Sequence, residues 1–138
     1  MDLHKLSLSK QLEGLKKGDF TSTELTSHYL NRISELDGQL NSFITVTEDQ
    51  ALSQAKAADD RYNTNNNLPL DGLPIAHKDI FCTKGILTTC GSKMLSNFEA
   101  PYSSTVYDKL DKNGMVMLGK TNMDEFAMGS SNETSYFG

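Results

Sequence analysis

The sequence predicts an α/β protein in which N-terminal helices are followed by the start of a mixed sheet. Two observations lead to this fold class. Apolar residues recur at helical three- and four-residue spacing through most of residues 1–62. From residue 73 onward, short apolar segments suited to strands alternate with a helical segment and several turns. The order strand, helix, strand in this second part favours a parallel pair of strands joined by a helical crossover.

The first two helices have recognisable ends. Residues 7–17 predict a short helix that ends at Gly18, because glycine readily adopts the left-handed conformation that closes a helix. Residues 21–24 (TSTE) have the capping-box pattern and open a second helix, which Asp37 and Gly38 are expected to end. The expected apolar stripes are Leu8, Leu12 and Leu15 in the first helix and Leu25, Tyr29, Ile33 and Leu36 in the second.

A short strand and a third helix follow. Residues 42–46 predict the strand, and residues 47–50 (TEDQ) repeat the capping-box pattern. The third helix should therefore begin after Thr47 and fade near Arg61. It is rich in alanine, so it can approach a neighbouring element closely. The alanines in question are Ala51, Ala55, Ala57 and Ala58.

The asparagine-rich segment 63–71 predicts a surface loop. We interpret it as a connection within one domain, because a helical layer of this size would bury little surface alone. The sequence thus predicts that residues 1–138 form the N-terminal part of a single domain. Its helical layer covers about 1–62, and the beginning of its sheet core covers about 73–138.

The second part contains one further full helix. Residues 103–105 can cap it, and Gly114 is placed to close it through a left-handed residue. Val106 and Leu110 are expected to point inward. The remaining expected elements are an apolar strand over 115–118 and a short helix over 122–128 that Thr121 caps.

Lys78 is the sharpest candidate for chemistry. It lies within residues 73–81 (LPIAHKDIF), which predict a strand packed on both faces. A buried lysine must find a carboxylate, reach water or lose its proton. An ordinary lysine pKa is ~10.4, and burial can lower it by ~3–5 units, into the range of a working base. The spacing leaves two alternatives open: an ion pair with Asp79, or a surface lysine at a strand edge.

Other polar residues have more ordinary interpretations. His77 should face away from Lys78, since neighbouring side chains on a strand point to opposite faces. Asp124 and Glu125 suit the positive end of a helix. Residues 129–131 (GSS) read as a loop that could bring backbone donors or a hydroxyl to a substrate. Because no Gly-x-Ser-x-Gly elbow occurs, the residues indicate a base without its nucleophile.

Composition narrows the function classes. The net charge of −5 argues against a primary nucleic-acid-binding role. No run of 18 apolar residues occurs, so we expect no membrane span. The N-terminus lacks an apolar secretory core and arginine enrichment, which indicates a cytoplasmic protein. Cys82 and Cys90 have no His or Cys partner at zinc spacing, so we expect reduced packing residues and no metal site.

Three segments together resemble the amidase signature family. They are residues 72–79 (GLPIAHKD), 88–95 (TTCGSKML) and 118–130 (LGKTNMDEFAMGS). Within that family, residues 122–135 (NMDEFAMGSSNETS) are similar to the glutaminase A subunits of tRNA-dependent amidotransferases. The resemblance covers essentially the whole chain. It implies the amidase signature fold, of which this chain would hold an incomplete, N-terminal part.

The resemblance also implies a mechanism. Family members use a serine–serine–lysine triad, and its lysine falls on Lys78. That lysine accepts a proton from a serine in a cis peptide, which in turn activates the nucleophilic serine. An acyl-enzyme forms and ammonia leaves. The family would place Met128, Gly129 and Ser130 near the substrate. Both catalytic serines are expected beyond Gly138, so we expect residues 1–138 alone to be inactive.

The implied partners are the B and C subunits of an amidotransferase. Glutamine would supply ammonia, and a partner subunit would use ATP and Mg²⁺ to convert misacylated Glu-tRNA(Gln) to Gln-tRNA(Gln). The resemblance implies no cofactor bound by this chain itself. Two alternatives stay open: a stand-alone amidase of the same family, and a non-catalytic remnant or binding segment.

Overall fold

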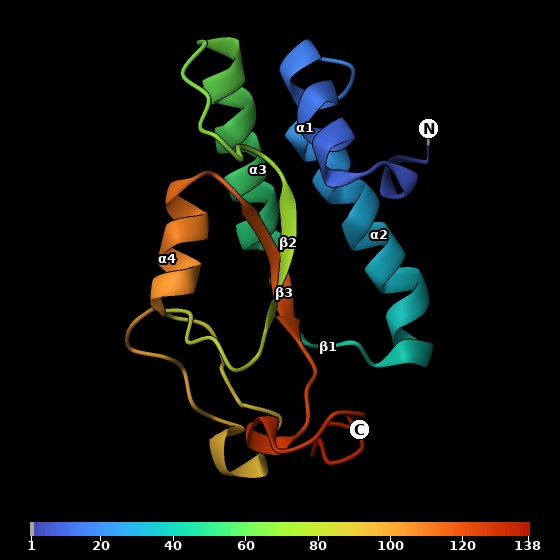
Figure 1. The fold of residues 1–138 in the computed structure, drawn as a ribbon, viewed down its shortest axis with the longest axis vertical. Helices are drawn as coiled ribbons and strands as arrows, with labels where there is room; N and C mark the ends of the chain where they lie inside the picture. The colour runs from blue at the N-terminus through green and yellow to red at the C-terminus, as the bar shows by residue number, and fades with distance from the viewer. Residues whose placement is uncertain (1) are drawn as a thin grey trace.

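The computed structural model describes residues 2–138 and places helices around a three-stranded mixed sheet, which confirms the predicted α/β class (Figure 1). The α-helices are α1 (Leu8–Lys17), α2 (Ser22–Leu40), α3 (Glu48–Asn63) and α4 (Thr105–Lys112). The strands are β1 (Phe43–Val46), β2 (Pro74–Lys78) and β3 (Val116–Thr121). Three single-turn 3₁₀ helices are η1 (Leu3–Lys5), η2 (Lys93–Leu95) and η3 (Glu125–Ala127).

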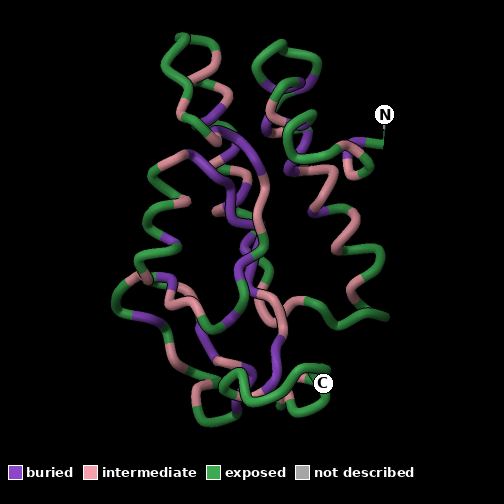
Figure 2. Tube along the Cα trace, in the orientation of Figure 1, coloured by how far each residue is buried: buried purple, intermediate pink, exposed green. Residues whose placement is uncertain are grey.

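Strand β3 is the centre of the sheet. The strand order is β1-β3-β2, with β2 parallel and β1 antiparallel to β3. The predicted parallel pair with a helical crossover is therefore confirmed, and α4 lies in the crossover. Residues 116–120 of β3 are all buried, and Figure 2 shows buried residues running down the middle of the molecule. The register pairs Lys78 with Thr121, so both strands end at the same edge.

Local capping explains the first two helices. Ser7, expected as the first helical residue, is the cap of α1, and Gly18 closes the helix at a φ of 75°, as predicted. The capping box of Thr21 and Glu24 is also confirmed. The predicted end of α2 is wrong, because the helix continues to Leu40. Asp37 acts later instead: its carboxylate accepts the N–H groups of the two residues that follow the cap, Ser42 at 2.6 Å and Phe43 at 3.3 Å.

Helix α3 packs closely against β3, as its alanines predicted. Ala51, Ala55 and Ala58 are fully buried, whereas Ala57 is exposed. The predicted capping box at Thr47 is wrong. The Thr47 hydroxyl donates to the Met117 carbonyl at 3.0 Å, because Thr47 is buried beside the central strand.

Helix α4 is capped by Ser104 and followed by Gly114 at a φ of 90°, both as predicted. The expectation that Val106 points inward is wrong, since Val106 is 45% exposed. Tyr107 is buried in its place, with its ring 5.2 Å from that of His77.

The core consists of two clusters, and the partly buried Tyr29 of α2 packs against both. The outer members of the predicted stripes, Leu8 and Leu36, are more exposed than expected, at 54% and 38%. One cluster contains Leu3, Leu15, Phe20, Leu25, Leu73 and Met115. The other contains Leu30, Ala51, Ala55, Val116 and Leu118.

Two predictions near the candidate site are wrong. The strand at 73–81 is shorter and is not buried on both faces: β2 ends at Lys78, and Ala76 and Lys78 are exposed. The reason is that only the α4 side of β2 is covered: His77 is buried there, whereas Ala76 and Lys78 line open hollows on the other side. The helix expected over 122–128 is only the turn η3, because Thr121 belongs to β3 and Phe126 has a left-handed φ of 51°. Within residues 2–138, no helix is long and apolar enough to cross a bilayer.

Candidate active site

Lys78 borders a hollow of about 350 Å³ where β2 and β3 end. The carboxyl ends of parallel strands are where open α/β sheets most often bind ligands. In Figure 1 this region lies toward the C-terminus, below the sheet. The hollow is lined by Lys78, Asn122, Met123, Asp124, Ala127, Gly129, Ser130, Ser131 and Asn132.

The Lys78 side chain is exposed at this hollow. Asp79, the alternative partner considered from sequence, pairs with Lys120 instead. No carboxylate within residues 2–138 lies within ion-pair distance of the Lys78 amine. The expectation that this chain buries Lys78 is wrong, and the structure shows the alternative of a surface lysine on an edge strand. The amine is not held by a counter-ion.

His77 faces the opposite side of β2, as predicted. It is 4% exposed and lies between the rings of Tyr107 and Phe81, with centroid distances of 5.2 and 6.4 Å. Burial lowers the pKa of His77, and the positive charge of Lys120 lowers it further. The residue is therefore a packing histidine of the α4 side of the sheet.

The fully buried lysine of this region is Lys120, which the sequence reasoning missed. Its ammonium lies 3.2 Å from the Asp79 carboxylate and donates to the Phe81 carbonyl at 2.8 Å and the Thr88 hydroxyl at 3.1 Å. Burial lowers the pKa of Lys120, and the negative charge of Asp79 opposes that shift. The signal that identifies it is the strand order, because a lysine in the central strand β3 has less access to water than a lysine on the edge strand β2.

Asp124 builds the wall opposite Lys78. Its carboxylate accepts the N–H groups of Ser131, Asn132 and Thr134 at 3.1, 2.8 and 3.1 Å, and the Thr134 hydroxyl at 2.9 Å. These bonds, led by that from Asn132, lower the pKa of Asp124. The interpretation of Asp124 as a residue at the positive end of a helix is wrong, since no full helix follows it. It holds the 129–134 loop in place.

Gly129 passes directly over that carboxylate. A Cβ atom at this position would lie 2.6 and 2.7 Å from the two Asp124 oxygens, so only glycine fits without a shift. The next residue, Ser130, is exposed and lines the hollow with Lys78. The structure thus brings Lys78, Gly129 and Ser130 to one hollow. Met128 is 75% exposed and is not among the lining residues.

The arrangement offers an amine, a hydroxyl and a fixed loop around a space for a small ligand. Proton transfer from a hydroxyl to the amine is chemistry that such a set can support. Within residues 2–138, no group of three or more His, Cys, Asp or Glu side chains could hold a metal ion. Cys82 and Cys90 are free thiols, and burial raises the pKa of Cys90.

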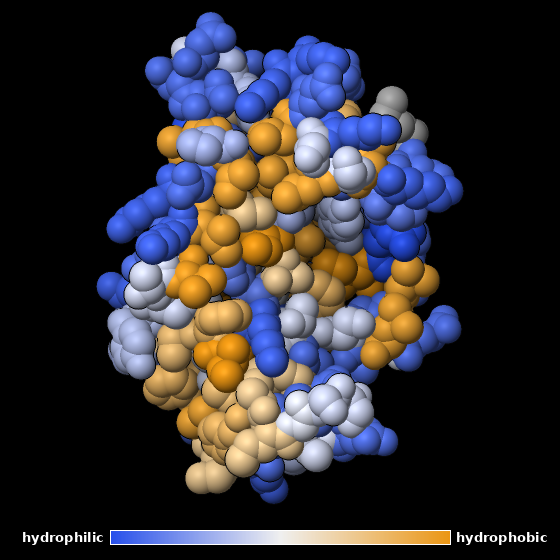
Figure 3. Space-filling model, viewed as in Figure 1, coloured by the Kyte–Doolittle hydropathy of each residue, from blue (hydrophilic) through white to orange (hydrophobic). Residues whose placement is uncertain are grey.

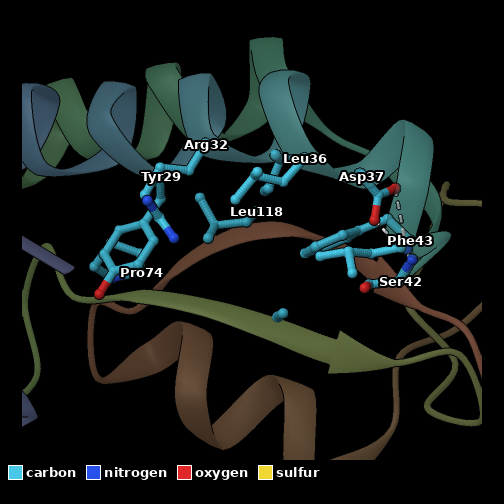
Figure 4. Close-up of a pocket in the computed structure, with 11 residues that line it drawn as sticks. Tyr29, Arg32, Leu36, Asp37, Ser42, Phe43, Pro74 and Leu118 are labelled. Atoms are coloured by element: carbon cyan, nitrogen blue, oxygen red, sulfur yellow. Dashed lines mark hydrogen bonds between the residues drawn. The ribbon is translucent and has the colours of Figure 1, made fainter. Parts of the chain in front are cut away.

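A second hollow, also of about 350 Å³, lies between α2 and the sheet (Figure 4). Tyr29, Leu36 and Leu118 contribute apolar surface to it, and apolar side chains also gather over the middle of the face shown in Figure 3. Its one carboxylate, Asp37, is engaged by the backbone of Ser42 and Phe43. This groove offers apolar contact and no free acid–base pair, so the hollow at Lys78 is the better candidate for the active site.

Comparison with known proteins agrees with the geometry. A family model described as amidase matches residues 24–138. The chain is 62% identical over 141 residues to the A subunit of glutamyl-tRNA(Gln) amidotransferase from Alcanivorax borkumensis, covering 99% of this chain and 29% of that protein. It is 58% identical over 136 residues to the same protein of Saccharophagus degradans, covering 99% of this chain and 28% of that protein.

Solved structures show the same fold. The A subunit of glutamyl-tRNA(Gln) amidotransferase from Thermotoga maritima matches with a TM-score of 0.78 and 35% identity, covering 99% of this chain and 27% of that chain. The peptide amidase from Stenotrophomonas maltophilia matches with a TM-score of 0.85 and 30% identity, covering 94% of this chain and 27% of that chain. This chain therefore spans between a quarter and a third of the length of these relatives. The match over residues 24–138 confirms the resemblance found in the motifs: the chain belongs to the amidase family.

Proposed function

We propose that this chain is the lysine-bearing part of the glutamine-hydrolysing A subunit of a tRNA-dependent amidotransferase. The observation that carries the proposal is the 62% identity to the A subunit of such an enzyme across 99% of the chain. The hollow at Lys78 is consistent with this role, because its walls come from the same segments that carry the motif resemblance.

In this proposal Lys78 is the base. A serine hydroxyl supplied from outside residues 1–138 gives its proton to the Lys78 amine. That serine then takes the proton of the nucleophilic serine, which attacks the side-chain amide carbon of glutamine. The proton returns to the leaving nitrogen, ammonia departs, and water hydrolyses the acyl-enzyme. Lys78 has no carboxylate partner in the described part of the chain. The proposal requires the rest of the protein to cover this exposed lysine, because burial favours the neutral amine that can accept a proton.

The loop opposite Lys78 would hold the substrate. Gly129 and Ser130 are the candidates for this contact, with Met128 at its outer edge. The ammonia would pass to the B and C subunits, where ATP and Mg²⁺ would activate misacylated Glu-tRNA(Gln). No cofactor is assigned to this chain in the proposal.

A stand-alone amidase is the second candidate, and one observation favours it. The fold matches the peptide amidase at a TM-score of 0.85, above the 0.78 of the amidotransferase protein. Both values describe a shared backbone, whereas substrate choice depends on side chains. The 30% identity to the peptide amidase is about half the identity to the curated A subunits, so the amidotransferase function is favoured.

The test uses the full-length protein purified together with its B and C partners. Ammonia release would be measured from glutamine and from a C-terminally amidated peptide. The proposal predicts a kcat/KM for glutamine well above that for the peptide, and formation of Gln-tRNA(Gln) when ATP and Glu-tRNA(Gln) are added. A preference for the peptide amide, with no tRNA product, would establish the stand-alone amidase instead.

A further inference from the structure

The buried ion pair of Asp79 and Lys120 has no part in the proposed proton transfer. Both side chains are 0% exposed. Asp79 follows Lys78 in the chain, and Lys120 precedes Thr121, the residue of β3 that pairs with Lys78. We infer that this pair is a positioning device, which fixes Lys78 relative to the opposite wall of the hollow. The inference rests on the proposed role of Lys78 as the base.

The pair first fixes the end of β2. Asp79 follows Lys78 in the chain, and its N–H donates to the Thr121 carbonyl at 3.1 Å. Lys120 donates to the Phe81 carbonyl at 2.8 Å, and the Phe81 N–H donates back to the Lys78 carbonyl at 3.1 Å. The turn that begins after Lys78 is therefore attached to β3 by backbone and side chain together. This attachment prevents the Lys78 backbone from sliding along the sheet.

The same pair binds the 88–92 loop. The Asp79 carboxylate accepts the N–H of Thr89 at 2.7 Å and also accepts the Thr89 hydroxyl. The Asp79 carbonyl accepts the Cys90 N–H at 3.1 Å. Lys120 donates to the Thr88 hydroxyl at 3.1 Å. Both charges of the pair thus hold consecutive residues of one loop.

That loop supports the opposite wall. The Cys90 carbonyl accepts the Phe126 N–H at 2.9 Å, and the Ser92 hydroxyl donates to the Glu125 carboxylate at 2.6 Å. Gly91 lies so close that a Cβ atom there would collide with the Met123 carbonyl oxygen. Residues 122–127 continue directly into the wall that contains Gly129 and Ser130. The pair consequently lies between the strand that carries Lys78 and the segment that faces it.

An apolar pair of the same volume would fill this space but would not fix the position of β2 relative to the 88–92 loop. Each charge here has several partners at defined directions, so the contacts specify relative position as well as proximity. Removing one charge alone leaves the other charge buried and uncompensated, whereas removing both charges together removes that cost, so a double variant should be more stable than either single variant. This difference separates a positioning role from a purely structural one.

The experiment compares Asp79→Asn, Lys120→Met and the double variant in the full-length protein bound to its B and C partners. Thermal unfolding and the kcat and KM for glutamine would be measured for each. A misplacement of about 1 Å at a catalytic group can cost about 100-fold in rate. We therefore expect kcat to fall by up to about 100-fold with little change in KM. The double variant should recover its unfolding temperature while its kcat stays low. Wild-type kcat in a stable double variant would overturn the inference.

A milder pair of variants covers the case in which the charged variants do not fold. Thr89→Val removes the hydroxyl that donates to Asp79 and accepts the Gly91 N–H, and it keeps the backbone bond to Asp79, whereas Thr89→Ser keeps all three bonds. Changes within a coupled network alter function by roughly 2- to 30-fold. Thr89→Val should lower kcat within that range without raising KM, and Thr89→Ser should restore it. Equal kcat values in the two variants would contradict the positioning role.

Two controls separate this inference from the proposed function. Lys56→Met, on the exposed surface of α3, should keep both kcat and stability. Lys78→Met should abolish hydrolysis if Lys78 is the base. Retained hydrolysis in Lys78→Met would overturn the proposed function, and the positioning role with it. An inactive Lys78→Met together with a fully active double variant would overturn the positioning role alone.

Discussion

Gly129 and Asp124 show how single residues shape the hollow. The Asp124 carboxylate collects three backbone N–H groups from the loop that follows it, and Gly129 crosses above it. The constraint on Gly129 is space, because its φ lies outside the left-handed region. Any side chain there must displace the carboxylate or the loop that carries Ser130.

Gly129→Ala is therefore expected to impair the site. The added methyl group would lie 2.6 and 2.7 Å from the Asp124 oxygens, so the loop must move. A shift of about 1 Å near a substrate can lower the reaction rate by about 100-fold. We therefore expect kcat/KM for glutamine to fall by up to that factor. Gly38→Ala is the matched control, because a Cβ atom at Gly38 meets nothing within 4 Å. It should stabilise α2 by about 0.5–1 kcal/mol without changing activity. Equal activity of the two variants would contradict this account of the loop.

His77 gives the protein a pH-dependent stability. Its pKa in the folded state lies below the ordinary value of 6.5, because it is buried and near Lys120. Below about 6.5 the unfolded chain binds a proton that the folded chain resists, so the free energy of unfolding should decrease as pH falls. His77→Phe should reduce this dependence between about pH 8 and about pH 5. Urea unfolding of both proteins at the two pH values measures the free energy of unfolding. If this free energy changes equally with pH in the two proteins, His77 is not responsible for the dependence.

At the scale of elements, close packing of α3 on β3 positions the sheet. The small side chains of Ala51, Ala55 and Ala58 allow this approach, and Thr47 anchors the start of α3 on the Met117 carbonyl. Gly119 allows a different close approach, that of β1 to β3, since a Cβ atom there would collide with the Thr45 carbonyl. The position of β3, and so of Lys120, depends on these small residues.

Ala55→Leu tests this packing. Its side chain has no space against the sheet, and overpacking of this kind costs about 1–3 kcal/mol of unfolding free energy. Ala57→Leu is the control, because Ala57 lies on the same helix but is exposed. Denaturant unfolding should show a lower free energy of unfolding for Ala55→Leu and almost no change in it for Ala57→Leu. Similar values for both would mean that α3 is not tightly packed at Ala55.

The elements also show what sequence could predict. Several signals that act within a few residues were correct: the capping box at Thr21, the cap predicted within residues 103–105, and the closing glycines Gly18 and Gly114. Thr47 carries the same local pattern, but a carbonyl on β3 competes for its hydroxyl. Such competition depends on tertiary contact and cannot be read from a local pattern.

The site could be predicted only in part for the same reason. The motifs point to Lys78, Gly129 and Ser130, which lie at one hollow. Their roles stay predictions. Lys120 was missed because its burial follows from the strand order, in which β3 is central and β2 is at an edge. Until that order is known, the lysine of 73–81 is as good a candidate for burial as the lysine of 116–121.

At the scale of the whole molecule, the proposed function makes this chain one face of a larger catalytic arrangement. It spans between a quarter and a third of the length of its relatives, and its hollow is open to solvent beside Lys78. The apolar groove between α2 and the sheet is also open, with Leu36 and Leu40 at 38% and 66% exposure. The proposed mechanism assigns the base to this chain and the activated hydroxyl groups to the rest of the protein.

The most direct test of that assignment is glutamine hydrolysis by Lys78→Met in the full-length protein with its partners. A general base contributes about 10²–10⁴-fold, so we predict a loss of at least that size with unchanged thermal unfolding. Lys78→Arg should fail as well, because arginine stays protonated. Lys84→Met, at another exposed lysine, should remain active. Near-normal hydrolysis by a folded Lys78→Met protein would contradict the central claim that Lys78 is the base.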